Sequence, residues 1–471
     1  MEKVKEYDVL VVGAGVGMNV VFKALEAGLK VALVGKDYLG GTCLNFGCVP
    51  SKTLIYSADR IREIEEAGRI GVTARVTEVD FASIMARMNK ARDHGRSFLR
   101  EEIESSGKNL DYFHVPAHFT DANLNGPHTM ELEGEPGGEF QGQLIRGKKV
   151  FIASGSRPLI PPIEGIGETG YLTNESVLEL KRPPESLIII GGGYIAVEYA
   201  HFFSAMGARV TIIEALESLI SQEEPEIIDV FEAEMSRYVW INKGLKVIEA
   251  GREGAGVFVT GQNKNGEKKR FTAESLMVAA GRVSNADLIG AASAGIQTDE
   301  RNYIKVDDGL LTNVGNIWAF GDAIGRQMFT HAGDKESEIA WHNATHDEKM
   351  SMDFDSVPHA IFAHPQIAGA GLTEKMARQR YGDDVLVGRA SYSDVTKGIA
   401  MQEKAGFAKA VAQKKTKRLL GFHILGPMAP VLIQEAANTI ANGGNADYIT
   451  KSMHIFPELS ELIPEALSRL K

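Results

Sequence analysis

Residues 7–17 read YDVLVVGAGVG, an apolar run that ends in a glycine loop. Such a continuous run is typical of a parallel strand that is buried on both faces. Residues 20–28, VVFKALEAG, have helical apolar spacing and end in a glycine, and KVALVG at 30–35 has the pattern of the next buried strand. This strand–helix–strand unit predicts a dinucleotide-binding fold near the N-terminus.

The same order of elements returns at residues 186–214, SLIIIGGGYIAVEYAHFFSAMGARVTIIE. Gly191, Gly193 and Ala196 form a GxGxxA pattern between a strand and a helix, where the backbone can approach a pyrophosphate at the helix N-terminus. Glu214 ends the following strand, and a carboxylate there binds ribose hydroxyls and repels a 2′-phosphate. We therefore predict a second dinucleotide fold that binds NAD rather than NADP.

The first glycine loop departs from the pattern GxGxxG. Gly13 and Gly15 fit, but Met18 stands where the third glycine is expected and Gly17 comes one position early. Gly35 occupies the position of the acid that usually follows the second strand, so the sequence assigns no ribose contact to the first cofactor.

A later segment also points to a cofactor site. NIWAFGDAIG at 316–325 predicts a strand that ends at Gly321 and Asp322. A carboxylate at the carboxyl end of a strand can accept hydrogen bonds from cofactor hydroxyls, although an Asp after Gly is also typical of a turn or a helix cap.

Both cysteines of the chain, Cys43 and Cys48, fall in the segment GGTCLNFGCVPSK at 40–52. Pro50 fits the first turn of a helix, so Cys48 is expected near that helix's N-terminus, where the helix dipole favours a thiolate. Two thiols are too few for a structural zinc site or an iron–sulfur cluster. The spacing alone is compatible with a redox pair or with two buried thiols that have no chemical role.

Composition narrows the class of protein. The chain has 471 residues and a formal net charge of -11, which disfavours nucleic acid as a partner. No apolar run approaches the length of a membrane span and the N-terminus has no leader pattern, so we expect a cytoplasmic chain with no membrane segment. The length predicts about three domains.

Other segments predict the organisation around these motifs. Residues 59–106 have the spacing of long helices, while 181–186 and 222–226 are polar and are expected to be solvated connections. After residue 340, strand-like and helix-like stretches alternate without a glycine loop, which predicts a separate α+β domain. The charged run at 414–418 is expected to be a hairpin tip in water.

Six short segments, spread from about residue 6 to the C-terminus, together resemble the FAD-dependent pyridine-nucleotide disulfide oxidoreductases. They are GGTCLNFGCVPSK at 40–52, ASGSRP at 153–158, GGGYIAVE at 191–198, AAGRVSN at 279–285, FGDA at 320–323 and FPELSE at 456–461. Dihydrolipoamide dehydrogenase is the family member nearest in overall pattern. The two-cysteine motif is highly specific for this family, so the resemblance favours a redox pair.

The resemblance implies an α/β fold with two Rossmann-like domains, one for FAD and one for NAD(H), and a C-terminal α+β dimerisation domain. The implied boundaries are 1–157 with 281–345 for the FAD domain, 158–280 for the NAD domain and 346–471 for the interface domain. A homodimer is the implied assembly.

The resemblance also implies roles for single residues. Cys48 would lie beside the flavin, Cys43 would attack the substrate, and Lys52 would lie near flavin N5, paired with Glu198. Tyr194 would lie over the flavin until the nicotinamide displaces it. Two electrons would pass from NADH through FAD to the Cys43–Cys48 disulfide, and the released thiolate would attack an oxidised partner.

The cofactor-binding residues that the resemblance implies come from both glycine loops and from the segments that follow them. Gly13, Gly15 and Asp322 would hold FAD. The full set is Gly13, Gly15, Gly17, Gly41, Thr42, Lys52, Ser154, Gly155, Gly321, Asp322, Ala323, Gly191, Gly193, Tyr194, Ile195, Glu198, Glu214 and Gly281.

The C-terminal motif departs from the family. Disulfide reductases of this family carry a His immediately before the motif's proline, paired with a Glu four residues beyond it, and this His is the acid–base in the partner subunit. Here Phe456 precedes Pro457 while Glu461 remains, and phenylalanine cannot transfer protons. His454 is a further catalytic candidate, although a structural or interface role is the favoured interpretation.

Several functions therefore remain open. The leading hypothesis is an NADH-linked FAD enzyme that acts on a small-molecule or protein-bound disulfide, with lipoamide as one candidate. A mercuric-reductase-like enzyme and an NADH-dependent reductase of a quinone or similar acceptor are alternatives. A third alternative is a flavoprotein that has lost catalytic activity and serves as a binding subunit. The electron acceptor and the direction of reaction depend on partner potentials, which the sequence does not contain.

Overall fold

The computed structural model describes residues 4–120 and 126–471. The chain has the predicted mixed α/β architecture and forms two compact units. One unit comprises Met1–Pro50, Arg87–Leu159 and Arg282–Phe354, and the other comprises Ser51–Ala86, Ile160–Gly281 and Asp355–Lys471. The domain boundaries expected from the sequence remain predictions.

The first unit is built on a seven-stranded sheet with the order β3-β2-β1-β6-β5-β4, in which β16 also pairs with β6. Its strands are β1 (Lys5–Val12), β2 (Val31–Val34), β3 (Leu110–Phe113), β4 (Ala117–Phe119), β5 (His128–Leu132), β6 (Leu144–Ile152) and β16 (Ile317–Ala319), with a separate pair formed by β7 (Ser156–Pro158) and β15 (Arg282–Ser284). Its helices are α1 (Met18–Glu26), α2 (Gly41–Phe46), most of α4 (Phe81–Ser105) and α7 (Thr330–Thr345).

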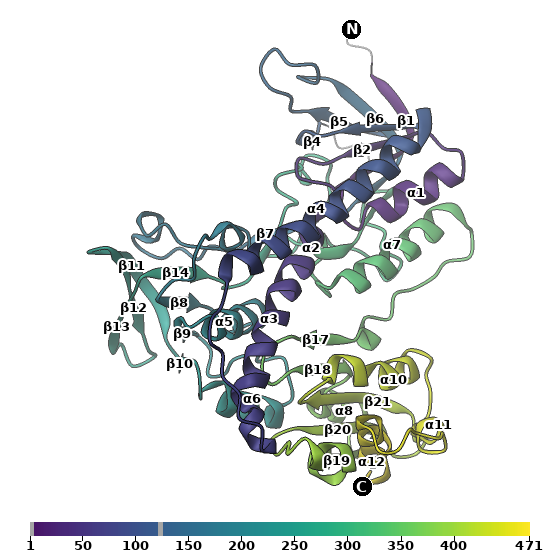
Figure 1. Ribbon diagram of the computed structural model, residues 1–471. Helices are drawn as coiled ribbons and strands as arrows, with labels where there is room; N and C mark the ends of the chain where they lie inside the picture. Colours follow the sequence, from purple (N-terminus) through teal and green to yellow (C-terminus); the bar gives the residue numbers. More distant parts are fainter. Residues whose placement is uncertain (1–3, 121–125) are drawn as a thin grey trace. The chain divides into compact units, whose positions relative to one another are not determined.

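The centre of this sheet confirms the strand–helix–strand prediction. Strand β1 pairs in parallel with both β2 and β6, and Val9 is aligned with Val31 on one side and Lys149 on the other. Val9, Leu10 and Val11 are fully buried, as the apolar run predicts. Helices α1 and α7 lie side by side (Figure 1), joined by a 2.9 Å hydrogen bond from Asn19 Nδ2 to Asp334.

The second unit holds three sheets. A parallel sheet of order β10-β9-β8-β14 contains β8 (Ser186–Ile190), β9 (Arg209–Ile213), β10 (Trp240–Asn242) and β14 (Ser275–Val278), and an antiparallel sheet contains β11 (Lys246–Glu253), β12 (Gly256–Gln262) and β13 (Lys268–Ala273). The third has the order β17-β18-β21-β20-β19, with β17 (His359–Ile361), β18 (Ile367–Gly371), β19 (Val385–Ser391), β20 (Phe407–Gln413) and β21 (Leu419–Leu425). The helices are α3 (Cys48–Glu66), α5 (Tyr194–Ala205), α6 (Pro225–Met235), α8 (Glu374–Tyr381), α9 (Thr396–Ala400), α10 (Ala429–Ala441), α11 (Ala446–Thr450) and α12 (Leu462–Ser468), of which α3 begins in the first unit.

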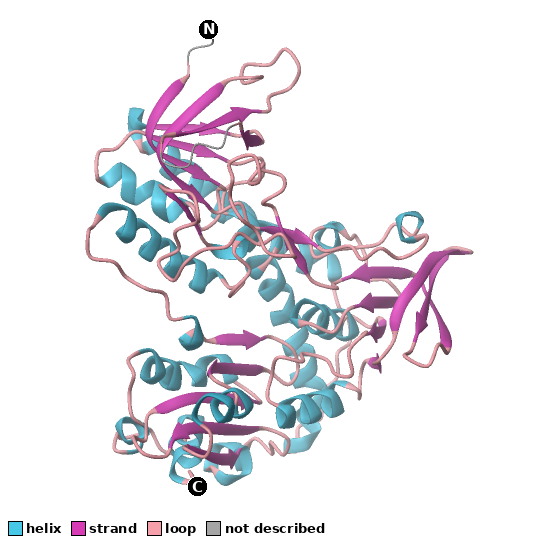
Figure 2. Ribbon diagram, turned by 180° about the vertical axis from the view of Figure 1, so that it is seen from behind, coloured by secondary structure: helices cyan, strands magenta, loops and turns pink. Residues whose placement is uncertain are grey.

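The two faces of the five-stranded sheet pack differently. Alternate residues of β18, β20 and β21, among them Ala370, Ala410 and Phe422, form one buried core with α10 and α12. Figure 2 shows this sheet in magenta with helices against it. The opposite face packs with α8, whose Ala377 lies in a smaller cluster with Val411.

A row of basic residues crosses the sheet on that opposite face. His359 is paired with Gly369, Gly369 with His423, and His423 with Lys409, on four consecutive strands. Paired residues of neighbouring strands point to the same face, so the three basic side chains lie in line. Gly369 leaves room for both imidazoles, because a Cβ there would lie 2.6 Å from His359 Cε1 and 2.8 Å from His423 Nδ1.

The acidic segment 222–226 packs against this basic row. Glu224 accepts a hydrogen bond from Lys409 Nζ at 3.1 Å, and Glu223 lies 3.0 Å from His359 Nε2. Glu223 and Glu224 are buried, with exposed fractions of 5% and 1%. The prediction of a solvated connection at 222–226 is therefore wrong, because these carboxylates meet basic side chains that are distant in the sequence.

The expected hairpin tip is confirmed. Residues 414–418 connect β20 to β21 as an exposed hairpin tip. Across residues 4–120 and 126–471, no helix combines the length and the apolar character that a membrane span requires.

Candidate active site

The two sulfurs meet where one helix ends and the next begins. Cys43 lies in the short helix α2 and Cys48 begins the 19-residue helix α3, as predicted from Pro50. Gly47 separates the two helices with a non-helical backbone, and a Cβ there would lie 3.0 Å from Thr42 O and 3.4 Å from Cys43 Cα. Gly47 therefore packs closely on the backbone of α2.

The cysteines are thiols in this structure, and they interact with each other. The side-chain hydrogen bond with Cys48 is the main cause that raises the pKa of Cys43 well above its ordinary value, and burial adds to it. Thr330, the first residue of α7, opposes this shift, and its Oγ1 lies 3.4 Å from Cys48 Sγ. Both sulfurs thus share one hydroxyl that can accept or donate a hydrogen bond.

Asn45 fixes the loop in front of the thiols. Its side chain is fully buried and donates to Leu39 O at 2.9 Å and to Gly41 O at 2.8 Å. Its Oδ1 accepts from Arg96 Nε of α4 at 2.5 Å, and its backbone oxygen accepts from Arg92. These bonds hold α2 to both the glycine turn and α4, so Asn45 restricts where Cys43 can lie.

The first glycines of the two glycine loops have similar backbone geometry. Gly13 has a φ of +107° and a Cβ there would lie 2.1 Å from Ala153 O, while Gly191 has a φ of +112° and a Cβ there would lie 2.3 Å from Ala279 O. Only glycine suits such a turn. Each loop leads directly into a helix, α1 or α5, whose first N–H groups can bind a phosphate.

The irregular third glycine of the first loop has a packing role. A Cβ at Gly17 would lie 2.3 Å from Gly13 O and 2.9 Å from Val11 Cγ1, so helix and strand pack closely at this position instead of at Met18. Gly41 also approaches the loop, because its Cβ would lie 2.7 Å from Gly15 Cα. The resulting backbone cradle fits the pyrophosphate of a dinucleotide such as FAD.

A polar cluster surrounds the end of β16. Asp322 accepts a 2.6 Å hydrogen bond from Ser156, whose oxygen also accepts one from Arg282 Nε at 2.6 Å. Behind it, Glu336 of α7 is fully buried and accepts from Gly321 N at 2.6 Å. Burial is the main cause that raises the pKa of Glu336 to about 7, and the charge of Asp322 adds to it.

In the second unit, Glu214 lies against the second glycine loop. A Cβ at Gly192 would lie 2.9 Å from Glu214 Oε2, and Glu214 Oε1 accepts from Leu216 N at 2.7 Å. The carboxylate is thereby held at the carboxyl end of β9, where an acid in dinucleotide-binding folds can bind ribose hydroxyls.

The predicted pair of Lys52 and Glu198 is present. Lys52 Nζ lies 2.9 Å from Oε1 and 2.7 Å from Oε2 of Glu198, whose side chain is buried. Glu198 also accepts from Phe362 N at 3.0 Å, and the Lys52 ammonium lies 4.9 Å from the centre of the Phe362 ring. Two donors, the Lys52 ammonium and the Phe362 N–H, thus make three hydrogen bonds to the buried Glu198 carboxylate and hold it in place.

The C-terminal motif shows the effect of the missing His. Phe456 is 70% exposed, and Oε2 of Glu461 is buried without a hydrogen-bond partner among the described residues. His454 instead contacts Glu435 of α10 at 3.1 Å, which agrees with a structural role.

The remaining predicted cofactor-binding residues are divided between the two units. Thr42, Ser154, Gly155 and Ala323 belong to the first unit, and Gly193, Ile195 and Gly281 to the second. Their roles, like those of the other predicted site residues, remain predictions.

Comparison with known proteins decides the family. Residues 7–346 match the family model described as pyridine nucleotide-disulphide oxidoreductase, and residues 357–467 match the model for the dimerisation domain of the same enzymes. The chain belongs to the pyridine nucleotide-disulfide oxidoreductases. It is therefore an enzyme of a family that uses FAD and a pyridine nucleotide.

Relatives in this oxidoreductase family match over nearly the whole chain. Mycothione reductase of Mycobacterium tuberculosis is 31% identical, and the match covers 99% of each chain. Dihydrolipoyl dehydrogenase of Synechocystis is 30% identical, with 98% of each chain covered. The structure of a Cu(II) complex of the HOCl-induced flavoprotein disulfide reductase RclA from Escherichia coli has a TM-score of 0.85 at 27% identity, and covers 99% of each chain.

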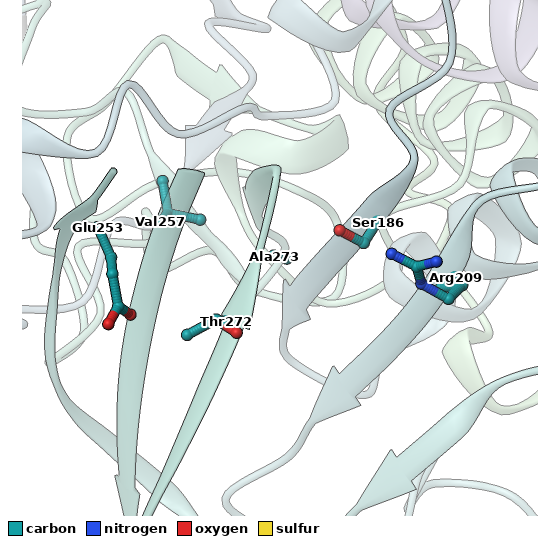
Figure 3. A pocket seen from close by; sticks show the side chains of 6 residues that line it. All are labelled: Ser186, Arg209, Glu253, Val257, Thr272 and Ala273. Atoms are coloured by element: carbon teal, nitrogen blue, oxygen red, sulfur yellow. The ribbon is translucent and has the colours of Figure 1, made fainter. Parts of the chain in front are cut away.

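The second unit of this oxidoreductase also has a surface depression. It has a volume of about 400 Å³ and is lined by Ser186, Arg209, Glu253, Val257, Thr272 and Ala273 (Figure 3). Ser186 and Arg209 begin β8 and β9, whereas dinucleotides bind at the carboxyl ends of such strands. The depression is therefore not the nucleotide site.

Proposed function

We propose that this chain is an NADH-dependent FAD enzyme that reduces a disulfide substrate through Cys43 and Cys48. The observation that carries the proposal is the contact of the two thiols with each other and with Thr330 at the junction of α2 and α3. The overall reaction would be NADH + H⁺ + R–S–S–R → NAD⁺ + 2 R–SH. Bound FAD would supply the two-electron relay between the nicotinamide and the sulfurs.

The chain's own residues would act around that relay. Cys43 would attack the substrate disulfide to give a mixed disulfide, which Cys48 would then resolve. Lys52, held by Glu198, would present a positive charge toward the flavin. Tyr194 would cover the flavin and move away when the nicotinamide binds.

Glu214 supports NADH as the reductant. Its carboxylate is fixed against Gly192 at the second glycine loop, where the 2′-phosphate of NADPH would meet a negative charge. The segment 215–226 that follows contains no Arg or Lys to neutralise such a phosphate.

A homodimer is part of the proposal. The dimerisation-domain model covers residues 357–467, and four large apolar side chains near the end of this region are at least 70% exposed. They are Tyr448, Met453, Ile455 and Phe456. A second copy would cover them, so sedimentation velocity should give twice the monomer mass of 51.1 kDa, and a monomer at micromolar concentration would overturn this assembly.

A second candidate function is the reduction of a thiophilic metal cation such as Cu(II). Phe456 favours it, because electron transfer from a dithiol to a metal cation does not need an acid to protonate a leaving thiolate. Among the described residues, no group of three His, Cys, Asp or Glu side chains could hold a metal, so the cation would meet the thiols directly. The reaction would be NADH + 2 Cu(II) → NAD⁺ + H⁺ + 2 Cu(I).

The thiol route predicts a specific effect of Cys48→Ser. Anaerobic reduction of the FAD-loaded wild type with NADH should produce a long-wavelength charge-transfer absorbance, because a thiolate at Cys48 would donate to the flavin. Cys48→Ser should lose this band, whereas Cys43→Ser should keep it and lose turnover. A wild type that NADH does not reduce would contradict the proposed function, and faster reduction by NADPH would contradict the role of Glu214.

Phe456→His should separate the two candidate functions. The new imidazole would donate a hydrogen bond to Oε2 of Glu461, which has no partner among the described residues, and would restore an acid–base pair. Turnover with lipoamide should therefore rise by about 10²-fold or more. Phe456→Leu, which changes the same position without adding a group that transfers protons, is the matched control and should have little effect. Unchanged disulfide turnover, together with Cu(II) reduction, would favour the metal reaction instead.

A further inference from the structure

Tyr194 is held by two side chains that the predicted chemistry does not use. It is the first residue of α5, directly after the second glycine loop. Its hydroxyl donates a 2.7 Å hydrogen bond to Glu223 Oε1, and its ring stacks on the His359 imidazole, with centroids 6.1 Å apart and planes 13° apart. Glu223 also lies 3.0 and 3.1 Å from His359 Nε2, so the three side chains form a closed triangle.

The surroundings of Glu223 in this triangle favour its ionised form. Burial alone would raise its pKa, but the charge and hydrogen bond of His359, the Tyr194 hydroxyl and the charge of His423 together lower it below its ordinary value. Burial also raises the pKa of the Tyr194 hydroxyl, so that group stays a donor. A hydrogen bond from a neutral hydroxyl to a buried carboxylate is among the stronger ones in proteins.

The position of Glu223 is set by the five-stranded sheet. His359 belongs to β17. The neighbouring Glu224 accepts hydrogen bonds from Lys409 Nζ of β20 and, at 2.6 Å, from Glu374 N. These two bonds restrict the position of the segment that carries Glu223. The C-terminal sheet therefore determines where Tyr194 lies at the start of the nucleotide-binding helix.

We propose that Glu223 is a positioning residue that holds the Tyr194 ring in its nucleotide-free orientation, so that NADH binding must break the Tyr194–Glu223 hydrogen bond. This inference rests on the proposed function, in which Tyr194 moves aside for the nicotinamide. A dinucleotide whose pyrophosphate binds at the N-terminus of α5 lies next to Tyr194, the first residue of that helix. The bond thus lowers NADH affinity, because part of the binding free energy is used to break it.

A double-mutant cycle on the FAD-loaded enzyme tests the proposal. Tyr194→Phe removes the donor and Glu223→Gln removes the charge of the acceptor, while both keep the side-chain shape. Each should lower the Kd for NAD⁺ and the KM for NADH by about tenfold, the size of one charge-assisted hydrogen bond. The double variant should bind no more tightly than the better single variant, because both changes remove the same interaction.

Glu226→Gln is the matched control. Glu226 lies three residues from Glu223 and accepts from Lys409 Nζ at 2.9 Å, but it makes no contact with Tyr194 among the described interactions. It should leave the affinity for NAD⁺ unchanged. If Glu223→Gln does not fold, Tyr194→Phe alone decides, because its hydroxyl is the only group removed.

The outcomes separate this proposal from the proposed function. Unchanged or weaker NAD⁺ binding in Tyr194→Phe, or additive effects in the double variant, would overturn the positioning role. Reduction of the thiol pair by dithiothreitol should be equal in all variants, since it does not involve the nucleotide site. A wild type that NADH fails to reduce would instead count against the proposed function.

Discussion

The approach of two sulfurs five positions apart in sequence is the constraint on which the proposed chemistry depends. In an unbroken helix, such residues would be separated by about 7.5 Å along the axis and would point in different directions. A disulfide needs Cα atoms within about 7 Å and converging side chains. The break at Gly47 meets this need, because α2 ends there before α3 begins, and the two thiols contact each other across it. Asn45 then holds α2 in place through the turn before it and through α4.

The same chain solves the problem of nucleotide binding twice. Gly13 and Gly191 adopt nearly the same φ, and each closely approaches the residue that follows a neighbouring strand of its sheet, β6 or β14. The loops differ in their acids, because Glu214 is held at the second loop, whereas Gly35 follows the corresponding strand in the first. In the first unit, carboxylates gather instead at the end of β16, where Asp322 and the buried Glu336 lie one behind the other.

The sequence predicts those features that depend on neighbours along the chain. Both glycine loops, the helix that begins at Cys48 and the hairpin tip at 414–418 follow from local rules, and the structure has them. The pairing of Lys52 with Glu198 came only from the family resemblance. Glu223 and Glu224 were expected in water, since nothing local shows that His359 and Lys409 arrive from strands more than a hundred residues away. The sequence did not indicate Thr330 and Glu336 as site residues for the same reason. At Glu336, a charged residue at a position that faces the core of helix α7 could have indicated a buried carboxylate.

The most direct test of the central claim is a count of reactive thiols by alkylation and intact-protein mass spectrometry. Cys43 and Cys48 are the only cysteines of the chain, so the mass shift reports on this pair alone. The oxidised, FAD-loaded enzyme should take up no alkyl groups when denatured, and the enzyme treated with NADH without oxygen should take up two. Two alkyl groups in the air-oxidised enzyme, or none after NADH, would contradict electron transfer between the nicotinamide and a Cys43–Cys48 disulfide.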